Sequence, residues 1–172
     1  MIIYESGMNF GKYEEADVFQ IEKSSQYMEK LMPNGVKSCE FIRRKANKIY
    51  FIEAKTSCPN QITAETQEEK KEKYRKYVDD ITQKMRNSLD LYANILLNRY
   101  PNDGVGAHLM EKDLSSSEIK LVLVVKNAEK AWLEPFEDVF NKLLRDELKI
   151  WKIPRVFVIN EQMAKEKGLV CE

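Results

Sequence analysis

The sequence predicts an α/β protein in which helices flank a single mixed β-sheet. Two apolar runs separated by a short polar stretch, residues 36–43 and 49–55, predict a β-hairpin early in the chain. A stripe of apolar residues at helical spacing follows between residues 66 and 99. Strand, helix and strand patterns then alternate over residues 119–159, which is typical of parallel strands joined by a crossover helix.

Length and composition set the bounds of this fold. The chain has 172 residues, of which 43% are hydrophobic, so it is long enough to bury one substantial core. We expect a single domain over residues 1–172, with a first half at 15–100 completed by a strand, a helix and a strand at 115–172. Lys and Arg together number 28, as do Asp and Glu, so no global field attracts nucleic acid. Any contact with phosphate therefore needs local clusters of charge.

The first residues and the cysteines predict a location. The sequence does not start with a basic leader and a long apolar stretch, and no apolar run approaches the roughly 20 residues of a membrane span. Cys39, Cys58 and Cys171 are odd in number and lack the spacing of zinc ligands. We expect reduced thiols, a cytoplasmic location and no membrane contact, with Cys39 packed under the hairpin.

The first predicted elements are a short helix and the hairpin. Residues 21–32 have apolar residues near helical spacing, and the sequence Pro33-Asn34-Gly35 ends this segment. In the hairpin, a turn at Ala46–Asn47 places Glu40 directly opposite Glu53. Lys55 follows Glu53 by two residues, so both side chains leave the same face of the strand. Two carboxylates and one ammonium are thus expected to share a small patch.

A long helix and a loop follow the hairpin. Thr63 or Thr66 caps the helix, Thr66 forming a capping box with Glu69, and the helix ends near Arg99. The loop to His108 contains two glycines, but no Walker-type lysine follows them, which argues against a nucleotide triphosphatase. His108 is a candidate proton shuttle, with a solvated loop histidine as the alternative.

The second half predicts the rest of the sheet. Residues 119–125 are apolar and β-branched, as in a buried central strand. Residues 132–151 predict a helix, and residues 154–159 predict a further strand. Asn160 is placed to cap a last short helix that stops at Gly168.

The hairpin residues allow a chemical interpretation. Like charges directly across a strand pair cost roughly 0.2–1 kcal/mol, so Glu40 and Glu53 favour a cation between them. A hard divalent ion such as Mg²⁺ takes carboxylate oxygens and keeps waters that can attack a phosphodiester. The alternative is a solvated hairpin face on which Glu53 and Lys55 are incidental.

The stretch from Gly35 to Ser57 resembles the core of the PD-(D/E)XK, or restriction-endonuclease-like, nuclease superfamily. The resemblance implies a restriction-endonuclease-like core, with Glu40 as the first acidic ligand, Glu53 as the second and Lys55 as the catalytic lysine. It also implies Mg²⁺ or Mn²⁺ as the cofactor. Glu40 departs from the pattern because it replaces the commoner aspartate and no Pro-Asp pair precedes it.

A further acid often comes from the helix before these strands in that superfamily. Glu22 is our choice for this additional metal ligand. The alternative is that an acidic residue is simply favoured in a first helical turn by the helix dipole. Glu14, Glu15 and Asp17 are nearby competitors.

The expected function is that of a metal-dependent nuclease that hydrolyses phosphodiester bonds through Glu40, Glu53 and Lys55. The alternative is a catalytically inactive nuclease-like fold that binds nucleic acid or a protein partner. The basic hairpin turn supplies the expected nucleic-acid contacts, although any exposed hairpin tends to be charged there. These contacts are Arg43, Arg44, Lys45 and Lys48. The sequence leaves open whether the substrate is DNA or RNA, whether cleavage is endo or exo, and whether it has a sequence preference. It also leaves open whether the chain forms a homodimer or binds a partner protein.

Overall fold

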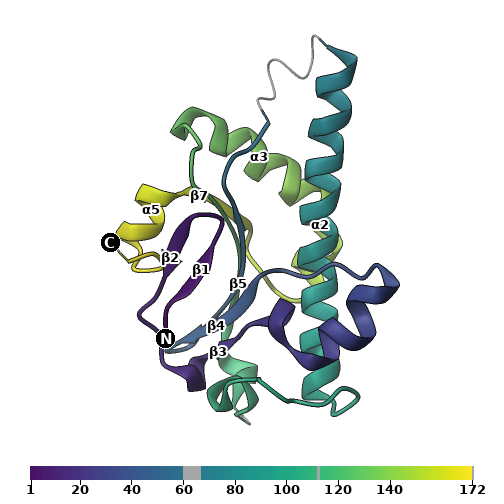
Figure 1. Cartoon of the computed structure of the whole chain (residues 1–172), viewed down its shortest axis with the longest axis vertical. Coiled ribbons are helices and arrows are strands. Elements are labelled where there is room, and N and C mark those ends of the chain that lie inside the picture. Colours follow the sequence, from purple (N-terminus) through teal and green to yellow (C-terminus); the bar gives the residue numbers. More distant parts are fainter. Residues whose placement is uncertain (60–66, 112, 172) are drawn as a thin grey trace.

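A computed structural model describes residues 1–59, 67–111 and 113–171 of the chain (Figure 1). Its centre is a five-stranded sheet with the strand order β3-β4-β5-β6-β7. The strands are β3 (Val18–Phe19), β4 (Phe41–Lys45), β5 (Lys48–Lys55), β6 (Glu118–Val125) and β7 (Val156–Asn160). The first three strands pair antiparallel and the last three pair parallel. The prediction of a mixed sheet in an α/β fold is confirmed.

Strands β4 and β5 form the predicted hairpin in the predicted register. Phe41 pairs with Ile52, and Lys45 pairs with Lys48 across the turn. The expected strand at 36–43 is shorter than predicted, because regular pairing in β4 begins only at Phe41. The residues before Phe41, among them Lys37 and Cys39, form hydrogen bonds to the long helix that follows the hairpin instead of to a strand.

The helices are α2 (Glu68–Leu96), α3 (Lys130–Leu143), α4 (Arg145–Ile150) and α5 (Glu161–Glu166). Helix α2 begins after Gln67, so the proposed caps Thr63 and Thr66 lie outside the described residues. The single helix expected at 132–151 is divided into α3 and α4 at Leu144, whose backbone is not helical (φ −99°, ψ 15°). Leu144 is fully buried, so its packing holds this break in place. Asn160 caps α5 as predicted, and its Oδ1 accepts the Met163 N–H at 3.0 Å.

The two faces of the sheet have separate apolar cores. Helices α2 and α3 cover one face, as Figure 1 shows, and pack on side chains such as Phe51, Leu123 and Val158. Helix α5 and a small hairpin of β1 (Ile3–Glu5) and β2 (Met8–Phe10) cover part of the other face. The side chains there include Ile52 and Val122. Successive residues of β5 and β6 therefore alternate between the two cores.

The segment at 21–32 is helical but is not the single amphipathic helix that was predicted. It consists of a 3₁₀ turn η2 (Ile21–Lys23), a π-helical stretch η3 (Tyr27–Leu31) and a 3₁₀ turn η4 (Met32–Asn34). Ser24 interrupts it with an extended backbone (ψ 146°), while its hydroxyl donates to the Ile21 carbonyl at 2.7 Å. Serine favours such local bonds over a helix interior.

Among the helices of the described ranges, none has the length and apolar character needed to cross a bilayer. The described cysteines are free, and Cys39 is buried as expected.

Candidate active site

Three glutamates from separate elements meet around one lysine. Lys84 lies in the middle of α2, and its Nζ is 3.0 Å from Glu53 Oε1, 3.3 Å from Glu22 Oε1 and 3.7 Å from Glu40 Oε1. Lys55 Nζ lies 2.7 Å from the same Glu53 Oε1. We call Glu22, Glu40 and Glu53 the acidic cluster. The structure thus brings together all the metal and catalytic residues predicted from the sequence.

Glu53 is the buried centre of this cluster. Its side chain is 0% exposed, on the sheet face that α2 covers. Lys84 Nζ donates a hydrogen bond to Glu53 Oε2 at 3.3 Å. Glu53 Oε1 lies 2.7 Å from Lys55 Nζ and 3.0 Å from Lys84 Nζ, so two ammonium groups compensate the burial of this carboxylate oxygen.

Hydrogen bonds to α2 position Glu40. The preceding residue, Cys39, donates its backbone N–H to Ser88 Oγ at 2.8 Å. Asn87 Nδ2 donates to the Lys37 carbonyl at 2.9 Å, and Lys37 forms an ion pair with Asp80. These contacts hold the chain before β4 against the helix, so the Glu40 side chain points toward Lys84 rather than outward.

Two of the residues around Lys84 and Glu53 are partly exposed to solvent. The Glu22 side chain is 36% exposed and the Lys55 side chain 30% exposed, whereas Glu40 and Lys84 are at 10% and 15%. Glu22 is held by η2, in which Ile21 is fully buried beneath it. Solvent therefore reaches the site at Glu22 and Lys55, whereas the Glu53 side chain is fully enclosed.

Burial and mutual repulsion change the acidity of the cluster. Burial, followed by the neighbouring Glu53 and Glu22 carboxylates, raises the pKa of Glu40 to about 8 against the opposing effect of Lys84. Burial also raises the pKa of Glu53, although Lys84 and Lys55 lower it. Glu40 therefore holds a proton at neutral pH, which reduces the negative charge around Lys84.

Lys84 stays charged in this environment. Burial lowers its pKa, but the carboxylates of Glu53, Glu40 and Glu22 together outweigh burial and raise the pKa above its ordinary value. The ammonium is thus a permanent positive charge at the point where the three carboxylates converge. It balances the cluster in the way that a bound cation would.

The donor set has the chemistry of a hard-cation site, but its present arrangement suits an ammonium. Within the described parts of the chain, no group of three or more acidic, histidine or cysteine side chains is arranged to hold a metal ion. Oxygens around Mg²⁺ lie about 2.0–2.1 Å from the ion, closer than the 3.0–3.7 Å around Lys84 Nζ. Binding of Mg²⁺ or Mn²⁺ would require the ammonium to move aside and the carboxylates to close in.

The basic turn has two kinds of residue. The Arg43 guanidinium stacks 3.9 Å from the centre of the Tyr13 ring and is largely buried. Arg44 forms ion pairs with Glu111 and, at 3.9 Å, with Asp113. Lys45 is exposed and Lys48 is half-exposed. Both arginines are thus engaged within the chain, and nucleic-acid contact by the four residues stays a prediction.

The competing acids and the histidine lie apart from the acidic cluster. Asp17 Oδ1 is 2.8 Å from His108 Nδ1, and this contact raises the pKa of the histidine. Glu14 and Glu15 are exposed. Among these candidates and Glu22, only Glu22 forms an ion pair with Lys84 in the described structure.

Lys84 is the residue that the sequence interpretation missed. It follows Ile81 by three residues and precedes Ser88 by four, so it lies on the apolar face of α2 together with Met85. A lysine inside an apolar helical stripe needs a buried partner. The lysine at position 84, which interrupts the apolar stripe of the helix, was therefore the feature of the sequence that indicated a buried ion pair.

No protein-family model, curated protein or solved structure matches this chain.

Proposed function

We propose that the protein is a metal-dependent nuclease that hydrolyses phosphodiester bonds at the acidic cluster. The observation that carries this proposal is the convergence of Glu22, Glu40 and Glu53 on a single cationic point beside Lys55. Three carboxylates directed at one point are unfavourable unless a positive charge lies among them. Such a set matches the ligands that Mg²⁺ and Mn²⁺ take in phosphoryl-transfer sites.

The order of elements supports a restriction-endonuclease-like core. Glu40 immediately precedes β4 and Glu53 lies in β5 of an antiparallel hairpin, helix α2 covers the sheet face from which Glu53 projects, and the next strand, β6, is parallel to β5. Glu53 pairs with Leu123 and Lys55 with Val125 of β6. The two functional side chains therefore project from a strand inside the sheet, where a rigid scaffold fixes their separation.

Each residue has a proposed role. Glu40, Glu53 and Glu22 would hold the ion, which when bound supplies Lewis-acid polarisation of the phosphate and an acidified water. Lys55, the more exposed lysine, is placed to neutralise charge on the phosphate oxygens. Lys84 holds the carboxylates together in the absence of an ion, and its ammonium would have to move aside when the ion binds.

A cleavage assay tests the proposal. We expect the wild-type protein to cut at least one of plasmid DNA, single-stranded DNA and RNA with Mg²⁺ or Mn²⁺, and not with EDTA. Glu53→Gln should abolish cleavage, while Glu134→Gln, at an exposed position on α3, should leave it unchanged. Intact substrates with both metals at high protein concentration would refute a nuclease.

One observation favours a second candidate, an inactive nuclease-like fold that binds nucleic acid or a partner protein. Lys84 already supplies the positive charge that the acidic cluster needs. On this account the carboxylates and Lys84 form a structural ion-pair network. Nucleic-acid binding that is unchanged by EDTA and by Glu53→Gln, without cleavage, would identify this second function.

A further inference from the structure

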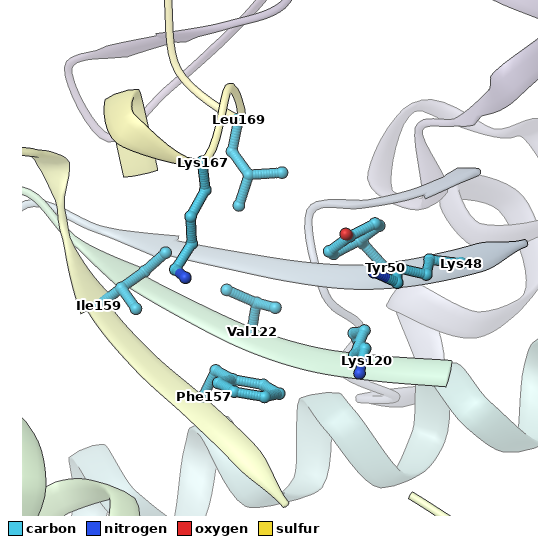
Figure 2. Close-up of a pocket in the computed structure, with 8 residues that line it drawn as sticks. All are labelled: Lys48, Tyr50, Lys120, Val122, Phe157, Ile159, Lys167 and Leu169. Carbon is cyan, nitrogen blue, oxygen red and sulfur yellow. The ribbon is translucent and has the colours of Figure 1, made fainter. Parts of the chain in front are cut away.

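A cavity lies on the sheet face that does not carry Glu53 (Figure 2). Its volume is about 290 Å³. Strands β5, β6 and β7 form its floor, and the segment after α5 closes one side. The lining residues are Lys48, Tyr50, Lys120, Val122, Phe157, Ile159, Lys167 and Leu169. Tyr50 and Glu53 lie on opposite faces of β5, so this cavity is separate from the acidic cluster.

The charged groups around the cavity are mainly positive. Lys48, Lys120 and Lys167 come from three different elements, and Figure 2 shows Lys167 extending over the strands toward Ile159. Only Lys120 has an ion pair among the described residues, at 2.9 Å from Glu118. Lys48 and Lys167 form no ion pair there, although Lys120 and, more weakly, Lys48 lower the pKa of the Glu118 carboxyl. One carboxylate faces three ammonium groups, so the cavity favours an anion.

The floor of the cavity is apolar and partly aromatic. Val122 and Ile159 are almost fully buried beneath it, whereas the rings of Tyr50 and Phe157 are half-buried, and the Arg155 guanidinium lies 4.7 Å from the centre of the Phe157 ring. The Lys120 ammonium lies 5.6 Å from the centre of the Phe157 ring. A ligand with a flat apolar part can contact the two rings while its charged part meets the lysines.

We propose that this cavity binds a nucleoside monophosphate. The phosphate would attract the ammonium groups of Lys48 and Lys167, which Figure 2 shows on opposite sides of the cavity and which form no ion pair within 4 Å with any described residue, and the base would lie against Tyr50 and Phe157. A base has a π-face that stacks on aromatic side chains, and lysine binds phosphate as a point charge. The volume lies at the lower end for ligand sites, so it suits one nucleotide rather than a strand. This inference does not rest on the nuclease proposal.

Calorimetry with AMP, adenosine and inorganic phosphate tests it. The titrations are made at low salt with EDTA, so that no divalent ion supports binding at the acidic cluster. We expect AMP to bind more tightly than either adenosine or phosphate. Lys167→Ala and Lys48→Ala should each weaken AMP binding about tenfold, since each removes one charged contact. Tyr50→Leu should weaken AMP binding by a similar factor by removing the stacking surface.

Two controls separate the cavity from general charge effects. Lys130→Ala removes the same charge at an exposed position on α3 and should leave AMP affinity unchanged. Glu53→Gln should also leave it unchanged, even if it abolishes cleavage. Circular dichroism checks that each variant is folded.

Several results would overturn the inference. The inference would be wrong if AMP did not bind at about 1 mM, if AMP and adenosine bound with equal affinity, or if Lys130→Ala and Lys167→Ala weakened AMP binding equally. Binding of an oligonucleotide but not AMP, lost in Lys167→Ala, would assign the cavity to a polymer instead.

Discussion

Lys84 Nζ lies 3.0 Å from Glu53 Oε1, and this contact joins the middle of the longest helix to the central part of the sheet. Within the hairpin, Lys55 forms an ion pair with Glu53, whereas the ion pair of Glu40 is with Lys84 of the helix. Helix α2 supplies this second positive charge from the side. The acidic cluster is therefore built by tertiary packing and not by the hairpin alone.

Removing this positive charge should destabilise the fold. In Lys84→Met, the carboxylate of fully buried Glu53 loses its main hydrogen-bond donor, and breaking a buried pair costs about 3–5 kcal/mol. Urea unfolding at neutral pH without metal measures the change. Lys70→Met, at an exposed position on α2, is the matched control and should stay close to wild type. A loss below about 1 kcal/mol would show that Lys84 does not balance the cluster.

The stability of the metal-free protein should fall as pH rises through the neutral range. Glu40 has a pKa of about 8 in the fold against an ordinary value of 4.5, so between these values the folded chain holds a proton that the unfolded chain has released. The free energy of unfolding then falls by about 1.4 kcal/mol per pH unit for one proton.

Glu40→Gln isolates this effect because the amide stays neutral. The variant should lose that part of the slope and be more stable than wild type above pH 8. Urea unfolding at a series of pH values checks it, with Glu134→Gln as the control that keeps the slope. Equal slopes in Glu40→Gln and wild type would mean that the carboxyl of Glu40 is not perturbed.

Lys55 should matter more for cleavage than for folding. Its side chain is 30% exposed, and Glu53 keeps Lys84 as a partner when Lys55 is replaced. Removing one group that stabilises the transition state costs about 10²–10³ in rate, so Lys55→Met should cut the cleavage rate about a hundredfold. Melting temperature, measured in parallel, should stay near that of wild type. An unchanged rate would remove Lys55 from the proposed chemistry.

The hairpin turn contains a strained residue. Ala46 has a positive φ of 52°, a conformation that costs a residue with a side chain about 1–2 kcal/mol. Ala46→Gly should therefore stabilise the protein by up to about 1 kcal/mol. Ala131→Gly, in the exposed part of α3, is the matched comparison and should destabilise it by a similar amount. Urea unfolding of both variants checks the opposite signs.

The hairpin and its register could be predicted from the sequence because local rules determine them. The turn at Ala46–Asn47 and the alternation of apolar residues fix the pairing of Phe41 with Ile52. The position of Glu53 and Lys55 on one face follows from the period of a strand, and the 2.7 Å ion pair is consistent with it.

The missed features depend on long-range contacts. Strands β1 and β2 have three residues each, too few for a periodic signal, and they are stabilised by packing on residues such as Val122. The break at Leu144 follows from burial rather than from a proline or glycine. The contact of Lys84 with the acidic cluster depends on the packing of α2 over β5, which local sequence rules do not determine. The position of Lys84 in the apolar stripe indicated only that it has a buried partner.

Calorimetric titration of Mg²⁺, and of Mn²⁺ in parallel, into wild type, Glu53→Gln and Lys84→Met most directly tests whether the acidic cluster is a metal site. We expect saturable binding to wild type and its loss in Glu53→Gln. Affinity should increase in Lys84→Met, because the ammonium no longer competes with the ion for the three carboxylates. Wild-type binding that Glu53→Gln leaves unchanged, or no binding by either wild type or Lys84→Met, would show that the acidic cluster is not a metal site.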